Sequence, residues 1–248
     1  MNIAIIGYGR MGKIIERTAK DRGHNVVSLI DPNCEDAQFD EVNEESMKDA
    51  DVCIDFTIPD VALENAINVS KHNVNIVMGT TGWYDQMDKM EKIVKDNKTG
   101  LIWSGNFSIG VNIFFRIINS AAKIINNIDN YDIFAYEMHH KGKKDSPSGT
   151  ANMIADMLIK NIDRKEKVVV DKLDRQIEPG ELHLASVRGG SVPGTHSVSF
   201  DSNADTIELK HTARSREGFA LGAVMAAEWI DKKKGFFHID DLMKDIIK

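Results

Sequence analysis

The chain has 248 residues, with 31 Lys and Arg against 38 Asp and Glu, which gives a formal net charge of -7. With 42% hydrophobic and 28% charged residues, the composition is that of a globular protein with a substantial core in one or two domains, which excludes disordered and fibrous classes. The acidic balance argues against a nucleic-acid partner, because proteins that bind nucleic acids are normally basic.

We expect a cytoplasmic protein with no membrane partner. No apolar run is long enough to cross a bilayer, and the N-terminus lacks the basic and apolar regions of a signal peptide. The two cysteines, Cys34 and Cys53, indicate neither a disulfide framework nor a metal-ligand spacing. We therefore expect no metal site.

The first 31 residues predict one strand–helix–strand unit. Asn2–Ile6 is a short apolar run typical of a strand buried on both faces, and residues 13–21 carry apolar side chains at helical spacing. Gly23 ends that helix, and Asn25–Ile30 is a second strand that closes on Asp31. Between the first strand and the helix lies a G-x-G-x-x-G sequence, Gly7-Tyr8-Gly9-Arg10-Met11-Gly12.

This context is the one that a dinucleotide-binding loop requires. The glycines permit a tight turn and close approach of a pyrophosphate, and the helix N-terminus offers backbone amides to it. Asp31 is placed to accept hydrogen bonds from the ribose hydroxyls and to repel a 2′-phosphate, and the next residues, Pro32 and Asn33, are not basic. NADH is therefore the favoured cofactor. NADPH stays possible, because Arg10 lies in the loop and can reach a phosphate.

Strands and helices continue to alternate after Asp31. Apolar runs predict strands at residues 51–56, 75–78 and 101–103, and helical stretches fall between them at residues 60–72 and 83–97. Such alternation is typical of a Rossmann-type α/β domain, a mostly parallel sheet with helices on both faces.

Two loops follow strands of this predicted sheet at the edge where ligands bind in such folds. The candidate cofactor-binding residues in them are Gly79, Thr80 and Thr81 in the first loop and Ser104, Gly105, Asn106 and Phe107 in the second. Thr81 is also a candidate substrate contact. Either loop alone has the composition of a plain turn, and the repeated placement favours the functional interpretation.

The pattern changes after residue 106 and predicts a second domain. A long amphipathic helix over residues 110–125 leads to a strand at 131–137, whose two faces are both apolar, and three further strands follow without helices between them, at 182–188, 195–200 and 205–211. Helices are expected again at 216–230 and 240–247. We predict a dinucleotide-binding domain of residues 1–106 and 213–248, and an α+β substrate-binding and oligomerisation domain with a mixed sheet at residues 107–212.

The most informative segment is residues 137–150, EMHHKGKKDSPSGT. Two histidines and three lysines fall within residues 139–144 without an acid among them, in a chain of net charge -7. Ser148 or Thr150 then caps a predicted helix, whose N-terminal amides and the adjacent cations together form an anion site suited to two carboxylates. A solvated basic loop is the simpler alternative. Histidine and lysine can also donate protons near neutral pH.

With Ala151 this segment resembles the E-x-H-H-x-x-K-x-D-x-P-S-G-T-A signature of the 4-hydroxy-tetrahydrodipicolinate reductase, or dihydrodipicolinate reductase, family of lysine and diaminopimelate biosynthesis. The resemblance extends along the chain through GYGRMG at 7–12, DFTIP at 55–59, GTTGW at 79–83, NFSIGVN at 106–112 and VRGGSVPGTHSVSF at 187–200. It implies an NAD(P)H-dependent oxidoreductase, typically a homotetramer, that reduces a cyclic imine dicarboxylate.

The resemblance also implies residue roles. His139 and Lys143 match the family's acid/base histidine and proton-donating lysine. The groups that hold the substrate carboxylates match His140, Ser148, Gly149 and Thr150. Ile58 stands where many members carry a basic residue, and Pro32 where some carry arginine, which again favours NADH.

Two alternatives stay open. One is an amino-acid-type NAD(P) dehydrogenase, against which the long basic loop argues. The other is a non-catalytic Rossmann-fold NAD(H) sensor, which would not need the histidine and lysine cluster.

Overall fold

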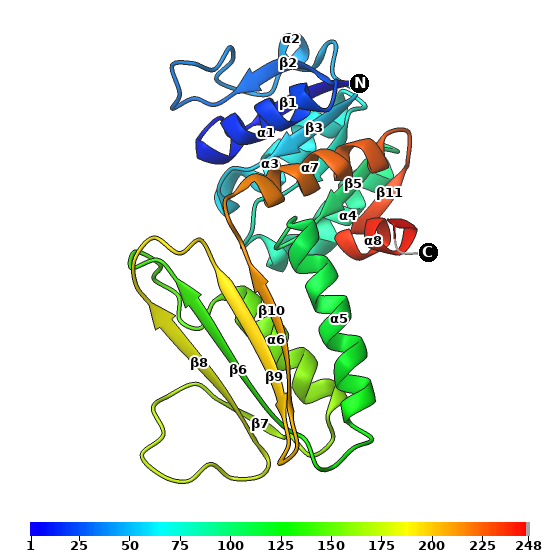
Figure 1. The fold of residues 1–248 in the computed structure, drawn as a ribbon. Coiled ribbons are helices and arrows are strands. Elements are labelled where there is room, and N and C mark those ends of the chain that lie inside the picture. Colours follow the sequence, from blue (N-terminus) through cyan, green and yellow to red (C-terminus); the bar gives the residue numbers. More distant parts are fainter. Residues whose placement is uncertain (247–248) are drawn as a thin grey trace. The chain divides into compact units, whose positions relative to one another are not determined.

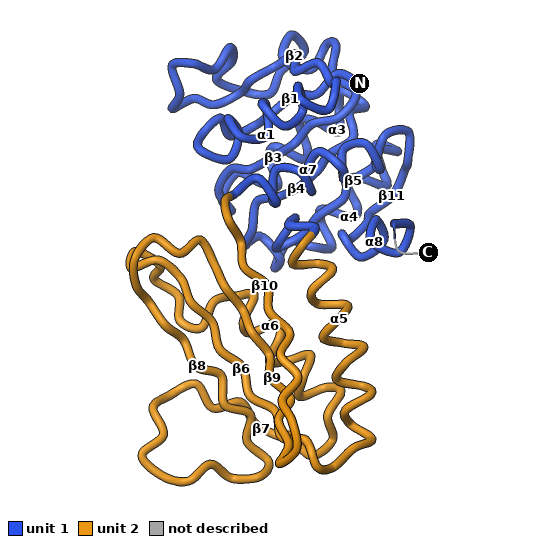
Figure 2. The backbone as a smooth tube through the Cα atoms, viewed as in Figure 1, with its two compact units in different colours: residues 1–109, 216–248 blue, residues 110–215 orange. Residues whose placement is uncertain are grey.

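The computed structural model describes residues 1–246, and the chain divides into two compact units. Unit 1 comprises residues 1–109 and the chain from residue 216 onward, and unit 2 comprises residues 110–215 (Figure 2). The backbone therefore passes between the units after Ile109 and after Ser215, whereas the sequence prediction put these points after residues 106 and 212.

Unit 1 is built on a six-stranded parallel sheet in the order β11-β5-β4-β3-β1-β2, which confirms the predicted Rossmann-type fold (Figure 1). The strands are β1 (Asn2–Ile6), β2 (Asn25–Ile30), β3 (Val52–Asp55), β4 (Asn75–Met78), β5 (Gly100–Trp103) and β11 (Gly235–His238). Four short apolar strands lie at the centre, buried on both faces, as parallel strands covered by helices must be.

Helices cover both faces of this sheet. They are α1 (Arg10–Asp21), α2 (Glu44–Met47), α3 (Pro59–Lys71), α4 (Met87–Asp96), α7 (Glu217–Ile230) and α8 (Ile239–Ile246), with a short 3-10 turn, η1 (Tyr84–Gln86), before α4. Alternate residues of β1 enter different cores: Ile3 and Ile5 pack with α1, α7 and α8, whereas Ala4 and Ile6 pack with α3 and α4.

The C-terminal segment returns to unit 1 and contributes more than the predicted helices. β11 pairs in parallel with β5 and forms one edge of the sheet, a strand that the sequence pattern did not predict. Its four residues, GFFH, are too short a run to stand out between two helices. The predicted last helix is α8, and its expected end at residue 247 lies outside the described residues.

Unit 2 contains a five-stranded sheet in the order β10-β9-β6-β8-β7. Parallel and antiparallel strands both occur in it, so it is the mixed sheet that the sequence predicted. The strands are β6 (Asp132–His139), β7 (Lys167–Val169), β8 (Glu181–Arg188), β9 (Thr195–Asp201) and β10 (Thr206–Thr212). Helices α5 (Ile109–Ile125) and α6 (Gly149–Asn161) supply apolar side chains to the core on one face of this sheet (Figure 1).

The register of the sheet places a polar row next to an apolar one. Ala135 of β6 pairs with Leu184 and Val198, and all three are buried in the core. Two residues on, Glu137 pairs with Ser186 of β8 and His196 of β9 on the same face. His139, the last residue of β6, pairs with Arg188. The inner face therefore changes from apolar to ionisable at the end of β6.

None of the helices in the described part of the chain is long and apolar enough to span a membrane.

Candidate active site

The G-x-G-x-x-G loop of unit 1 has the backbone that the motif requires. Gly7 has a φ of +87°, and a Cβ there would lie 2.3 Å from the carbonyl oxygen of Phe56. Gly9 precedes α1, has no side-chain cap, and has open space where a Cβ would be. The first-turn amides of α1 are thus accessible to a phosphate, so this loop fits a dinucleotide.

Asp31 lies beside this loop at the end of β2. One of its carboxylate oxygens accepts a hydrogen bond from the Tyr8 N–H at 2.8 Å, and the other accepts one from the Asn33 N–H at 2.9 Å. The carboxylate is therefore held at the edge of a cavity of about 430 Å³ in unit 1, which Gly7 and Gly9 also line. Among the described residues, the charged ones lining this cavity are all acidic: Asp31, Asp40, Glu41 and Glu64.

The predicted cofactor residues differ in what their side chains can offer. Arg10, Thr81 and Gly105 are exposed, whereas Met11 and Gly79 are half-buried. The Thr80 hydroxyl donates to the buried Asp55 carboxylate at 2.8 Å. Burial raises the pKa of Asp55, against hydrogen bonds from Thr80 and neighbouring groups that lower it. Thr80 thus fixes its loop to β3.

Four other predicted cofactor-binding residues have buried side chains or hydrogen bonds to nearby residues. The Tyr8 ring is buried, and its hydroxyl bonds to Glu16. Phe107 is part of the hydrophobic core of unit 1. Ser104 is buried and accepts a 3.0 Å hydrogen bond from the Asn106 N–H. The side chains of Tyr8, Ser104 and Phe107 are therefore engaged within unit 1, and the Tyr8 N–H donates to Asp31.

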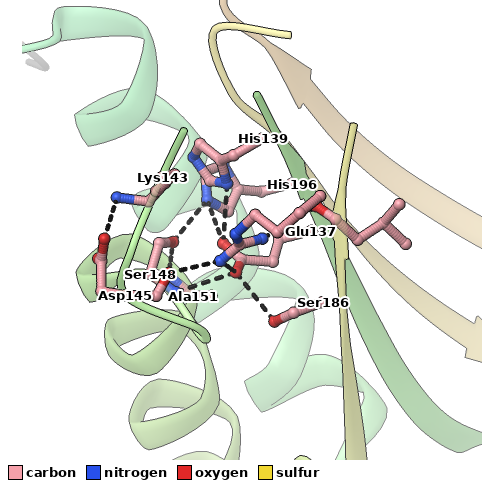
Figure 3. Close-up of polar contacts among 10 residues, drawn as sticks. Glu137, His139, Lys143, Asp145, Ser148, Ala151, Ser186 and His196 are labelled. Atoms are coloured by element: carbon pink, nitrogen blue, oxygen red, sulfur yellow. Dashed lines mark hydrogen bonds and ion pairs between the residues drawn. The ribbon is translucent and has the colours of Figure 1, made fainter. Parts of the chain in front are cut away.

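In unit 2 the basic segment follows β6 and is anchored to the loop after β8. His140 donates a 2.8 Å backbone hydrogen bond to Val192, and the Gly189 N–H donates one of 2.9 Å to His139. The Lys143 ammonium lies 2.8 Å from Asp145 and is about a quarter exposed. Lys143 is therefore held by an ion pair near His139 (Figure 3).

The centre of the cluster is Glu137, a fully buried carboxylate that the sequence prediction did not single out (Figure 3). Its Oε1 accepts hydrogen bonds from the Ser148 N–H at 3.0 Å, the Ser186 hydroxyl at 2.9 Å and the Arg188 guanidinium at 2.7 Å. Its Oε2 lies 3.2 Å from Nδ1 of His139 and 3.5 Å from Nε2 of His196.

These contacts set the protonation states of the cluster. Burial alone would raise the pKa of Glu137, but contacts with His196, Ser148 and Arg188 outweigh it and hold the pKa well below its usual range. Burial lowers the pKa of His139 to about 4, despite the opposite effect of the Glu137 carboxylate. His139 is therefore a neutral imidazole at neutral pH, and Glu137 is charged.

Ser148 is the N-cap of α6. Its hydroxyl accepts a 3.2 Å hydrogen bond from the Ala151 N–H and lies 3.2 Å from Nε2 of His196. A Cβ on Gly149, the first residue of the helix, would meet nothing within 4 Å. The helix start is thus fixed on its inner side and open at Gly149, which suits it to bind an anionic group.

Glu137, His139 and His196 also have the residue types and spacing of a metal site, with donor atoms within 4.8 Å of one another. However, Arg188 already lies against this carboxylate and supplies the positive charge that a buried anion needs. We therefore interpret the cluster as an ion and hydrogen-bond network.

The residues that sequence reasoning missed here are Glu137, Ser186, Arg188 and His196. Each is polar at a position where β6, β8 or β9 otherwise carries inward apolar side chains. The sequence signal for them is a polar residue at an inward position of an otherwise apolar strand. Only the strand register shows that the four residues meet.

A parallel sheet with a G-x-G-x-x-G loop, joined to a unit that carries an ionisable cluster and an open helix start, is typical of an NAD(P)-dependent oxidoreductase of the Rossmann class. The family comparisons agree. The family model for the N-terminal part of dihydrodipicolinate reductase matches residues 1–107, and the one for its C-terminal part matches residues 110–243. The chain belongs to the dihydrodipicolinate reductase family.

Individual relatives support this membership. The chain is 39% identical over 248 residues to a 4-hydroxy-tetrahydrodipicolinate reductase of Christiangramia forsetii, covering 100% of both chains. It is 38% identical to one of Archaeoglobus fulgidus, with 98% of this chain and 100% of the relative covered. The solved structure of a dipicolinate-bound dihydrodipicolinate reductase from Paenisporosarcina sp. TG-14 has the same fold, with a TM-score of 0.77, 24% identity, and coverage of 96% of this chain and 97% of that one.

Proposed function

We propose that the chain catalyses the NAD(P)H-dependent reduction of 4-hydroxy-tetrahydrodipicolinate to tetrahydrodipicolinate in lysine and diaminopimelate biosynthesis. The name of its relatives supplies this substrate, a cyclic imine dicarboxylate. The conversion removes the 4-hydroxyl as water, so its balance requires one hydride and one proton. The observation that carries the proposal is the basic segment beside the start of α6, which offers cations and helix amides to a dicarboxylate.

The glycine loop and Asp31 of unit 1 fit a nicotinamide dinucleotide, which supplies the hydride when bound. We propose NADH as the preferred form, because the charged residues lining the cavity beside Asp31 are all acidic among those described and would repel a 2′-phosphate. Arg10 is exposed in the loop and leaves NADPH as the weaker substrate. We also propose that the protein works in the cytoplasm, as expected from its sequence.

The proton in this proposal comes from Lys143. The alternative donor, His139, has its pKa lowered to about 4, so it holds no extra proton to give at neutral pH. Lys143 forms an ion pair with Asp145 and is partly exposed, so it can be reprotonated from water after each turnover. We therefore assign Lys143 as the acid, and His139 as a neutral group that orients or polarises the substrate.

The substrate carboxylates are assigned to the start of α6 and the residue after His139. Ser148 is the N-cap, and Gly149 and Thr150 begin the first turn, at the end of the helix where the dipole favours an anion. His140 is half-buried at the base of the basic segment. Thr81, exposed in unit 1, is proposed as a further contact.

We also propose a homotetramer that uses the outer face of the mixed sheet. Phe134 and Val187 are 40% and 50% exposed on this face, on neighbouring strands β6 and β8. Helices α5 and α6 pack on the opposite face, and no described helix covers the outer one (Figure 1). Exposed apolar side chains on an open sheet face are typical of a surface that a second copy covers.

The direct test is NADH oxidation, followed by absorbance, with and without freshly generated cyclic imine. The proposal predicts oxidation only with the imine, and inhibition by dipicolinate. Binding of NADH without oxidation would instead support the sensor, and oxidation of NADH with other imino or keto acids in place of this imine would support an amino-acid-type dehydrogenase.

A further inference from the structure

We propose that Glu137 is a positioning residue: its buried carboxylate fixes both the tautomer of His139 and the start of α6. The groups it positions take their roles from the proposed function, but the positioning itself concerns only residues of unit 2.

Glu137 lies on the inward face of β6, two residues before His139. Inward-facing residues of β6 alternate with outward ones, so Ile133, Ala135, Glu137 and His139 share one face. The first two pack in the core of unit 2, and the last is the candidate catalytic histidine. A carboxylate at the third of these positions is costly unless its environment compensates it, so its presence requires a reason.

Three of the groups that compensate this charge lie at one oxygen of the carboxylate. Oε1 receives three donors, from Ser148, Ser186 and Arg188, at 2.7 to 3.0 Å. Arg188 also donates a 2.6 Å hydrogen bond to the carbonyl oxygen of Asp145, the ion-pair partner of Lys143. The charge on Glu137 therefore also anchors, through Arg188, the loop that carries the proposed acid.

The second oxygen faces the histidines. Among the described residues, neither Oε2 nor Nδ1 of His139 has a hydrogen-bond partner, and the two atoms lie 3.2 Å apart. A carboxylate favours the tautomer that points an N–H at it. We infer that His139 carries its proton on Nδ1, which leaves the lone pair on Nε2.

The same carboxylate holds the helix start. The Ser148 N–H bonds to Oε1, and the Ser148 hydroxyl is the N-cap of α6. Loss of the charge on Glu137 would therefore loosen the proposed carboxylate-binding turn and reorient His139 together. A purely structural core residue would do neither.

Glu137→Gln separates these possibilities. The three donors keep the amide oxygen at the Oε1 position, so the amide NH₂ faces His139 and donates to its Nδ1. We expect the His139 tautomer, read from ¹⁵N chemical shifts of labelled imidazole at pH 7, to change from Nδ1–H to Nε2–H. The matched control is Glu181→Gln, which removes another buried carboxylate of unit 2, one that is paired with Arg175. It should leave the His139 tautomer unchanged.

Binding and turnover give a second readout. With Glu137→Gln we expect the Kd for dipicolinate, used as the dicarboxylate probe, to rise at least tenfold and kcat to fall on the order of 100-fold, the scale of a misplaced catalytic group. The Kd for NADH, which concerns unit 1, should stay within twofold.

Several outcomes would overturn the inference. A folded Glu137→Gln protein that keeps the wild-type tautomer and dipicolinate affinity would do so. If that variant does not fold, the wild-type spectrum decides, because a native Nε2–H tautomer contradicts the assignment. The ¹⁵N chemical shifts and the Kd for dipicolinate are both measured without turnover. If the protein is inactive on the imine, the proposed function is wrong, but this inference is unaffected.

Discussion

The backbone N–H of Ser148 donates a 3.0 Å hydrogen bond to Oε1 of Glu137, eleven residues earlier in the chain. This bond joins the inner face of β6 to the first turn of α6, so the segment between them is anchored at both ends. Lys143 lies in the middle of that segment. The loop that we propose presents Lys143 to the substrate is thereby fixed by a strand and a helix, the rigid elements that a functional site needs.

The lowered pKa of His139 has a consequence for stability. The folded-state pKa is about 4 and the ordinary value is 6.5, so between these values the unfolded chain binds a proton that the folded one does not. Stability is therefore present above pH 6.5 and is lost as the pH falls toward 4, by about 2–3 kcal/mol. Urea unfolding at pH 7 and pH 4.5 measures this loss. The loss of unfolding free energy should be clearly smaller in His139→Asn than in the wild type. An equal loss in the two proteins would contradict a lowered pKa of His139.

Asp31 is expected to set the cofactor preference. Asp31→Asn removes the charge that we propose repels a 2′-phosphate but keeps the size of the side chain beside the Tyr8 and Asn33 amides. The ratio of kcat/KM for NADH over NADPH should fall roughly 10- to 100-fold, the scale of a hydrogen bond to a charged group. Glu35→Ala, an exposed acid of the same loop, is the control and should keep the ratio. If the NADH-over-NADPH ratio is unchanged in Asp31→Asn, residues other than Asp31 determine the cofactor preference.

Alanine substitutions at Gly9 and Gly7 should have different effects on stability and on NADH binding. Gly9 has room for a Cβ, so Gly9→Ala should change Tm little but raise the Kd for NADH about tenfold or more by obstructing the phosphate approach. Gly7→Ala places a Cβ against the Phe56 carbonyl in a backbone that strains any side chain, and should lower Tm. Calorimetry and NADH titration check both. Full NADH affinity in Gly9→Ala would remove this loop from the cofactor site.

The outer face of the mixed sheet should control assembly. Val187→Glu puts a charge at a half-exposed position on β8, and should convert a tetramer to a smaller species in light-scattering measurements. Val170→Glu, 42% exposed just after β7, is the matched control and should leave the mass unchanged. If the wild-type chain is a monomer, the proposed interface is wrong.

The fold of unit 1 could be predicted because its signals are local. A buried strand such as Asn75–Met78 is a continuous apolar run with turn residues after it, and it is found at the predicted bounds. Strand β11 was missed because four residues between two helices carry too little pattern, and its place beside β5 is decided by a contact far along the chain.

The site was only half predictable for the same reason. His139, Lys143 and Ser148 lie in one contiguous motif, so the sequence alone brings them together. Arg188 and His196 come from other strands and meet Glu137 through strand register, which composition and periodicity do not determine.

We expect this chain to reduce the cyclic imine with a proton from Lys143. The most direct measurement is the initial rate of NADH oxidation at saturating imine for the wild type and for Lys143→Ala, together with the Kd for NADH. Lys172→Ala is the matched control, because Lys172 also pairs with an aspartate two residues on, Asp174 at 2.5 Å. We predict a kcat about 10²- to 10⁴-fold lower in Lys143→Ala, with NADH affinity unchanged and the control at the wild-type rate. An unchanged kcat in Lys143→Ala would contradict it.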